Sequence, residues 1–167
     1  KIDDIARLAQ VSRTTASMVL NGQGERYRIA ATTIERVKSV AAAHHYIPSQ
    51  SARALRSRKS RTLGLVIPEL TNYAHASLAQ ELEVQGREAG YQMLIATSND
   101  DPELETQGIA QLVAREVDGL LVVPATADRT AYEGWRTRLP LVFVDRRIDD
   151  SSIPFVVSDA ADVVAEV

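Results

Sequence analysis

The sequence predicts two folded parts: an all-α head of short helices, then an α/β domain built on a doubly wound parallel sheet. Charge divides the chain in the same place. Residues 1–61 hold 12 Lys and Arg against 4 Asp and Glu, and the chain totals of 19 and 22 leave 7 basic and 18 acidic residues beyond them. From Thr62 the hydrophobic pattern changes to apolar runs alternating with helical segments. We therefore expect modules at 1–48 and 62–167, joined by 49–61.

Composition limits the classes of protein. The chain is 45% hydrophobic and 25% charged, which is typical of a soluble globular protein. Its longest apolar runs, such as Thr62–Pro68, are too short to span a bilayer, so we expect no membrane partner. The absence of cysteine excludes disulfides, thiolate metal sites and a cysteine nucleophile. No charged-then-apolar leader opens the chain, and we expect a cytoplasmic protein. Because the sequence begins without Met at Lys1 and ends at Val167 inside an amphipathic stretch, we interpret it as a fragment.

The head opens with two short helices separated by a tight turn. Apolar residues of the first share one face: Ile2, Ile5, Leu8 and Ala9. Ser12 is a favourable N-cap for the second, Arg13–Leu20, and Asn21-Gly22 ends it. This is the helix-turn-helix pattern. The outer face of the second helix carries short hydroxyls, an amide and one Arg, which favours contacts with DNA over the alternative of an ordinary helical hairpin.

A third helix is predicted over Thr32–His45, with its core face at Ile34, Val37, Val40 and Ala41. Tyr46-Ile47-Pro48 ends it, because a residue before proline avoids the helical region. Ser49–Arg58 is compatible with a short helix, which would be marginal in water without a partner. We expect this segment to become helical on DNA; a flexible basic linker is the alternative.

These segments together resemble the head of the lactose-repressor (LacI) family of transcription regulators. The resemblance is carried by Ile2–Ser12 (IDDIARLAQVS), Thr15-Ala16-Ser17, Val19–Gly22 (VLNG), Tyr46-Ile47-Pro48 and Ala52–Arg56 (ARALR). It implies that Arg13 and Thr14 read bases. It also implies that a set of polar residues contacts phosphates: Ser12, Thr15, Ser17, Asn21 and Tyr46. Leu55, with Ala52 beside it, would enter the minor groove and kink the duplex.

Some positions depart from the family pattern. Ser49 stands where the family usually has Asn, and Ala30 replaces the usual Ser before the third helix, which removes a cap. The loop Gly22–Ile29 is longer than usual. Its Tyr27-Arg28 pair, with Val11–Ser17 (VSRTTAS), is similar to the fructose repressor or catabolite repressor/activator subgroup, with sucrose repressors next. Arg28 is a further candidate phosphate contact.

The acidic part reads as alternating strands and helices. We expect strands at Thr62–Ile67, Gln92–Thr97, Gly119–Val123, Leu141–Val144 and Phe155–Ser158. Helices are expected at Ala76–Ala89, Pro102–Arg115 and Arg129–Arg138. The turn Pro68–Asn72 (PELTN) lacks the glycines of a dinucleotide site, and the chain has no phosphate-binding loop, zinc motif or nucleophile elbow. We therefore expect no catalytic residues, no metal and no cofactor.

This part also resembles the family, through its sugar-sensing domain. The matching segments are Leu63–Pro68 (LGLVIP), Asn72, Gly90-Tyr91, Asp118–Val122 (DGLLV) and Pro140–Arg146 (PLVFVDR). They imply a periplasmic-binding-protein-like N-terminal subdomain, incomplete because a C-terminal subdomain would supply the rest of the pocket.

Asp145 and Arg146 match the family's ligand-binding pair, at a strand end where open parallel sheets bind ligands. A carboxylate accepts from sugar hydroxyls, and a guanidinium suits hydroxyls or phosphate; a loop salt bridge is the alternative. His75 replaces an aromatic residue that usually stacks on the ligand. Ser98 is a weaker candidate, as is Asn99, because both types also serve ordinary turns.

The resemblance as a whole implies a repressor that binds a pseudo-palindromic double-stranded DNA operator as a homodimer or dimer of dimers. A sugar or sugar phosphate would release it. The fructose-repressor resemblance implies fructose 1-phosphate, and a sucrose-type repressor sensing a neutral sugar is the rival. Two other classes are alternatives. A phosphosugar enzyme is disfavoured because the sequence has no catalytic cluster, and a sugar-binding transport protein is disfavoured by the basic head.

Overall fold

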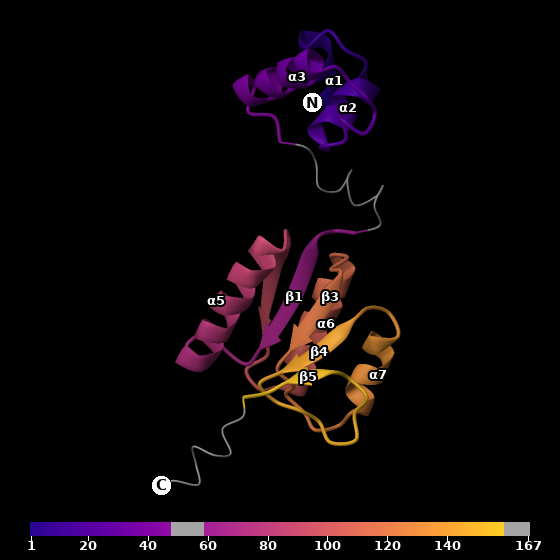
Figure 1. Cartoon of the computed structure of the whole chain (residues 1–167). Helices are drawn as coiled ribbons and strands as arrows, with labels where there is room; N and C mark the ends of the chain where they lie inside the picture. Colours follow the sequence, from indigo (N-terminus) through magenta and orange to yellow (C-terminus); the bar gives the residue numbers. More distant parts are fainter. Residues whose placement is uncertain (48–58, 159–167) are drawn as a thin grey trace. The chain divides into compact units, whose positions relative to one another are not determined.

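A computed structural model describes residues 1–47 and 59–158, which divide into two compact units (Figure 1). Each unit is described by itself. The expected segment Ser49–Arg58, with Ala52 and Leu55, lies outside the described residues, as does Asp159–Val167. None of the described helices combines the length and apolar character needed to cross a bilayer.

The head consists of three helices: α1 (Ile2–Leu8), α2 (Arg13–Leu20) and α3 (Ala31–Ala43). They share one small core of buried residues: Ile5, Ala6, Ala9, Ala16, Val19, Val37 and Ala41. This confirms the predicted all-α head.

The predicted caps of α2 are present. The Ser12 side chain accepts a hydrogen bond from the Thr15 backbone N–H, at 3.0 Å. Beyond the C-cap, Gly22 has φ +72°, a conformation that glycine adopts without steric cost. Ala30 makes no side-chain cap to α3, as its residue type predicts.

Two details of the head differ from expectation. Leu8 was expected on one apolar face with Ile5 and Ala9, but it is 47% exposed, because Ala9 takes the buried position at the end of α1. The third helix was expected to reach His45, but α3 ends at Ala43. His45 adopts φ +47°, in the left-handed region, so the backbone leaves the helical path there.

The second unit is built on five parallel strands in the order β2-β1-β3-β4-β5. Their bounds are β1 (Thr62–Ile67), β2 (Gln92–Thr97), β3 (Gly119–Val122), β4 (Leu141–Val144) and β5 (Phe155–Val156). Strand β1 is central and pairs in parallel with both β2 and β3. The sheet confirms the predicted doubly wound parallel fold, since its first crossover runs to one side of β1 and the next to the other.

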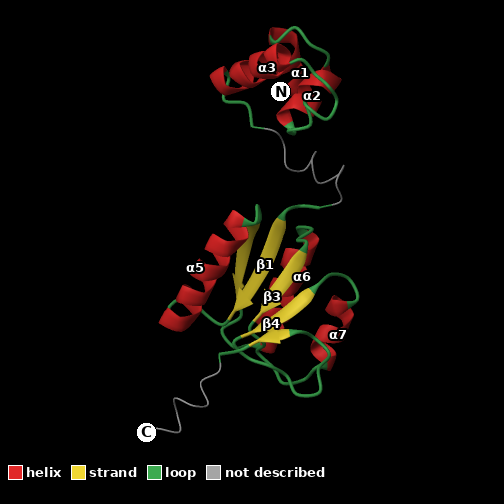
Figure 2. Cartoon of the chain, in the orientation of Figure 1, coloured by secondary structure: helices red, strands yellow, loops and turns green. Residues whose placement is uncertain are grey.

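Helices cover both faces of this sheet (Figures 1 and 2). Helix α5 (Tyr73–Glu88) packs on one face, where the buried residues are Leu65, Ile67, Ala79, Val123 and Val144. Helices α6 (Pro102–Ala114) and α7 (Thr130–Arg136) pack on the other, over a larger core that includes Val66, Ile109, Leu112, Leu120, Tyr132 and Phe143. Successive residues of β1 therefore serve opposite faces.

Two helices begin close behind strand ends, at caps that fix their first turns. Asn72 accepts from the Ala74 N–H at 2.9 Å, which starts α5 at Tyr73, three residues before the predicted Ala76. Asp101 accepts from the Glu103 N–H at 2.7 Å, and this cap starts α6. Both helix N-termini consequently lie at the carboxyl edge of the sheet.

Gly64 of β1 is the close-packing point between the sheet and α6. A Cβ there would lie 2.7 Å from Leu120 Cδ2 and 2.9 Å from Leu112 Cδ1. We predict that Gly64→Ala destabilises the full-length protein by ~1–3 kcal/mol through overpacking. Urea unfolding curves of the variant and the parent measure this difference.

Gly134 provides the matched control, because a Cβ on this α7 residue meets nothing within 4 Å. Gly134→Ala should be neutral or stabilise by up to about 1 kcal/mol, since alanine favours the helix. Equal losses in the two variants would contradict the assigned packing.

Candidate functional site

The outer face of α2 carries the two residues predicted to read bases. Arg13 and Thr14 are both exposed, in the first turn of the helix. The Arg13 Nε lies 3.5 Å from Asp3 Oδ1 of α1, and the two side chains are 72% and 61% exposed. Such an exposed ion pair contributes little, so Arg13 can exchange Asp3 for another acceptor at small cost.

The predicted phosphate-contacting residues lie along the same helix and at its ends. Ser12 and Thr15 hydroxyls are hydrogen-bonded to each other at 2.9 Å. Asn21 Nδ2 donates to the Ser17 carbonyl at 2.8 Å and lies 3.3 Å from Ser17 Oγ. These contacts within the chain hold the side chains in place at both ends of α2.

Tyr46 and Arg28 stand in different surroundings. Tyr46 is partly buried and packs against the head core, and its backbone N–H donates to the Ala41 carbonyl at 2.9 Å. Arg28 is exposed in the long loop, with φ +54°. Ala52 and Leu55 lie outside the described residues, so the minor-groove contact stays a prediction from sequence.

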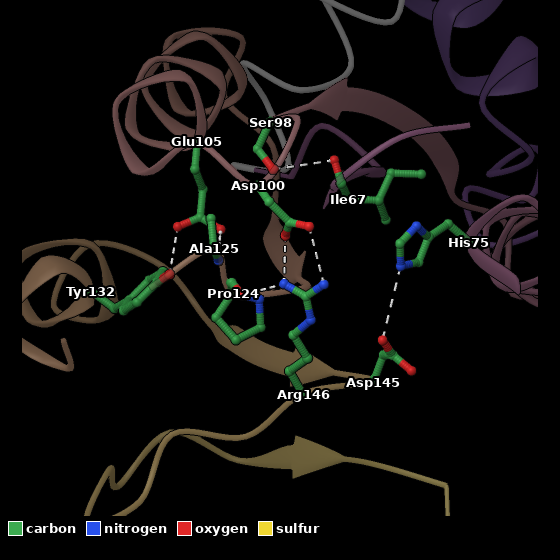
Figure 3. Close-up of polar contacts among 10 residues, drawn as sticks. All are labelled: Ile67, His75, Ser98, Asp100, Glu105, Pro124, Ala125, Tyr132, Asp145 and Arg146. Carbon is green, nitrogen blue, oxygen red and sulfur yellow. Dashed lines mark hydrogen bonds and ion pairs between the residues drawn. The ribbon is translucent and has the colours of Figure 1, made fainter. Parts of the chain in front are cut away.

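In the second unit, Asp145 and Arg146 follow β4 at the carboxyl edge of the sheet. The Asp145 N–H donates to the Val156 carbonyl of β5 at 2.9 Å, and Asp145 has φ +65°. The Arg146 N–H donates back to the Val144 carbonyl at 2.7 Å. This tight turn sends the two side chains in different directions, Arg146 toward Asp100 and Asp145 toward His75 (Figure 3).

Arg146 connects the ends of three strands. Its Nη1 donates to Asp100 Oδ1 and to the Pro124 carbonyl, the latter at 3.2 Å, and its Nη2 lies 3.3 Å from Asp100 Oδ2. Asp100 follows β2 and Pro124 follows β3. The hydrogen bond from Arg146 lowers the pKa of Asp100, and the same contact raises the pKa of Arg146. The pair therefore stays ionised near neutral pH.

His75, in the first turn of α5, lies beside Asp145. Its Nε2 lies 4.0 Å from Asp145 Oδ2, and the residue is 8% exposed. Among the residues that the structure describes, its Nδ1 has no hydrogen-bond partner. A neutral imidazole carries one donor and one acceptor nitrogen, so His75 places one of them beside the Asp145 carboxylate.

Ser98 takes part in the turn that follows β2. The residue is fully buried, its N–H donates to the Ile67 carbonyl at 2.9 Å, and its hydroxyl points at the same oxygen from 3.5 Å (Figure 3). Its neighbour Asn99 is exposed. Ser98 thus aligns the ends of β1 and β2, and its contact with a ligand stays a prediction from sequence.

Behind the site lies a buried carboxylate that the sequence reasoning missed. Glu105 of α6 is 2% exposed; its Oε2 accepts from the Ala125 N–H at 2.8 Å, and its Oε1 accepts from the Tyr132 hydroxyl. Burial raises the pKa of Glu105, and burial together with this carboxylate raises the pKa of Tyr132. The Tyr132 ring packs edge-on against Phe143, with centroids 4.9 Å apart. These contacts fix the loop that carries Pro124.

The sequence analysis also missed Asp100. A sequence signal for Glu105 was available, because Glu105, Gly108, Ile109 and Leu112 share the inward face of α6 at helical spacing. The sequence signal for Asp100 was weaker: it lies just beyond Thr97, at the same sheet edge as Asp145. Within residues 1–47 and 59–158, no group of His, Asp and Glu could hold a metal ion.

Comparison with known families identifies both units. Residues 1–49 match the family model of bacterial regulatory proteins of the lacI family. Residues 60–167 match the family model of periplasmic binding proteins and the sugar-binding domain of the LacI family. The chain belongs to the LacI family. It is a family of transcriptional regulators and not of enzymes, as the sequence predicted.

Individual relatives support the family assignment. The chain is 45% identical over 165 residues to the sucrose operon repressor of Klebsiella pneumoniae, covering 99% of this chain and 49% of that protein. It is 42% identical over 171 residues to the catabolite repressor/activator of Escherichia coli, covering 99% of this chain and 51% of that protein. The chain thus spans about half the length of these relatives.

Two solved structures show the same architecture. One is the lac repressor dimer bound to operator and the anti-inducer ONPF, with a TM-score of 0.85 and 24% identity, covering 97% of this chain and 49% of that one. The other is the Cra dual regulator of Pseudomonas putida in complex with fructose 1-phosphate. It has a TM-score of 0.59 and 36% identity and covers 64% of this chain and 40% of that one.

Tyr132 supplies one of two hydrogen bonds to a carboxylate that is shielded from water. We predict that Tyr132→Phe lowers the free energy of unfolding of the full-length protein by ~1–3 kcal/mol, because Glu105 Oε1 loses its donor inside the protein. Urea unfolding measures the change.

The matched control is Tyr73→Phe, which removes a hydroxyl from a residue that is 86% exposed and should change stability little. A Tyr132→Phe variant as stable as this control would show that Glu105 does not depend on the hydroxyl.

Proposed function

We propose that the full-length protein is a repressor of sugar-metabolism genes that binds operator DNA in the cytoplasm and is released by a sugar effector. The family assignment supports a DNA-binding regulator, and the similar protein of Klebsiella pneumoniae is a sucrose operon repressor. The single observation that carries the effector half is the meeting of Asp100, Asp145, Arg146 and His75 at one edge of a parallel sheet. Such edges are where open parallel sheets bind ligands.

The head supports operator binding through α2. A recognition helix presents its first residues to base edges in the major groove, and Arg13 and Thr14 hold that place in α2. Arg reads guanine with two donors, and the hydroxyls and amide of Ser12, Thr15, Ser17 and Asn21 suit phosphate oxygens. A homodimer, or a dimer of dimers, would place two heads on the half-sites of a pseudo-palindromic operator.

The effector we propose first is fructose 1-phosphate. Its support is the 36% identity to the Pseudomonas putida regulator whose structure holds this compound. The second candidate is sucrose, which is favoured by the 45% identity to the Klebsiella pneumoniae sucrose operon repressor. Both compounds contain a fructose unit, so a site that reads this unit serves either one.

Arg13→Ala should weaken operator binding and relax base preference, with ~1–3 kcal/mol of discrimination lost per base contact. Ser17→Ala, the matched variant on the same helix, should weaken operator and random DNA by similar factors, because a phosphate contact carries no sequence information. Binding curves of each variant on operator and random duplexes at one salt concentration measure both effects. An Arg13→Ala variant with undiminished operator preference would place the recognition surface elsewhere.

Asp145→Ala and Arg146→Ala should leave operator affinity unchanged and weaken effector binding by at least about tenfold, since each removes a charged hydrogen-bonding group from the site. Release from the operator should weaken in parallel, because an effector shifts DNA binding only through its different affinities for the two states. Calorimetry with fructose 1-phosphate and with sucrose, beside operator release, measures this. Parental affinity in both variants would remove the pair from the site.

A further inference from the structure

Arg146 has a negatively charged partner within its own chain, Asp100. Its Nη1 and Nη2 both face the Asp100 carboxylate, with Nη2 at 3.3 Å from Oδ2, and Nη1 also donates to the Pro124 carbonyl at 3.2 Å. A guanidinium uses this same two-pronged geometry to bind a phosphate group. Asp100 therefore occupies the place on Arg146 that a phosphate would take (Figure 3).

The charge around Arg146 reinforces this effect. Asp145 adds a second carboxylate, 48% exposed, whose Oδ2 lies 4.0 Å from His75 Nε2. Two carboxylates and one guanidinium therefore face this part of the site. A phosphate approaching this surface meets net negative charge, whereas sugar hydroxyls find carboxylate oxygens that accept their protons.

The turn that carries Asp100 is held in place by the backbone. Asn99 and Asp100 adopt φ +51° and +57°, a left-handed conformation that Asn and Asp tolerate better than most residues. The Asn99 N–H donates to the Pro68 carbonyl at 2.8 Å, and the Asp101 N–H donates to the Ser98 carbonyl at 2.9 Å. The Asp100 carboxylate is thus presented to Arg146 by a formed turn, and its side chain is 51% exposed.

We propose that Asp100 determines the specificity of the effector site, by holding Arg146 so that this half of the site accepts uncharged sugar hydroxyls and rejects phosphate. This rests on the proposed function, that the site at the sheet edge binds the effector. The fructose unit, common to both candidate effectors, would face Asp100, Arg146 and Asp145. The phosphate of a phosphosugar would be bound by groups outside this half of the site.

Asp100→Asn in the full-length protein tests the proposal. Asparagine keeps the size of the side chain and tolerates the left-handed backbone, but it removes the charge that neutralises Arg146. Fructose 1-phosphate and fructose are the probes, because they differ only by the phosphate. We expect the ratio of their association constants to rise about tenfold in the variant, as removal of a like charge a few ångströms away implies.

Glu103→Gln is the matched control, since it removes one exposed acid near the start of α6 and should leave the ratio within about twofold at ordinary ionic strength. Circular dichroism and the Tm verify that each variant is folded. A ratio that is unchanged or lower in Asp100→Asn would overturn the proposal. Weaker binding of both probes by the same factor would do so too, because it would make Asp100 only a support for Arg146.

Inorganic phosphate separates failure of this inference from failure of the proposed function. If the parent binds neither fructose 1-phosphate, fructose nor sucrose, the proposed function is wrong. The role of Asp100 is then judged by titration with phosphate alone. The role is supported if Asp100→Asn binds phosphate, the parent does not, and the Asp100→Asn/Arg146→Ala double variant loses this binding. Equal phosphate binding by the parent and Asp100→Asn refutes it.

Discussion

The parallel pairing of β1 with both neighbours is the constraint on which the rest of the second unit depends. Its residues from Gly64 to Ile67 are buried, and the pairing aligns Ile67 with Thr97 of β2 and Val66 with Val122 of β3. Strands that run the same way in this register end at the same edge. Loops from three strands therefore meet there, although the residues they carry are far apart in sequence, such as Asp100 and Arg146, separated by 46 positions.

The sequence predicted the positions of the five strands, although β3 ends at Val122 and β5 at Val156, before the predicted Val123 and Ser158. It was insufficient for the contacts between their loops. Thr62–Ile67, Gln92–Thr97 and Leu141–Val144 were predicted with the bounds that the structure gives, because each is an apolar run ended by turn residues. Asp145 and Arg146 could be selected because they directly follow a strand. No local pattern pairs Asp100 with Arg146, since that contact depends on the order of strands in the sheet. Helix starts such as Tyr73 were missed where a single cap decides them.

The site combines a buried support with a half-exposed binding surface. The support is the loop at Pro124 and Ala125, held by buried Glu105, where a carboxylate shielded from water cannot lose a partner without a large cost. The binding surface is the ion pair of Asp100 and Arg146, whose side chains are 51% and 41% exposed. Sugar hydroxyls can add hydrogen bonds to the outer oxygen and N–H groups of this pair while Asp100 stays on Arg146. The Pro124 carbonyl also accepts from Nη1 of Arg146 and keeps the guanidinium in position.

Charge differs between the two parts of the chain, and it also matters locally at the sheet edge. Residues 1–61 carry a net charge of +8, and the remainder carries −11. A basic module attracts phosphate in a salt-dependent way, and an acidic module repels it. At the sheet edge the formal charges of Asp100, Asp145 and Arg146 sum to −1. On the proposal that Asp100 determines the specificity of this site, the same repulsion acts there within a few ångströms, and one carboxylate beside Arg146 selects sugar hydroxyls over phosphate.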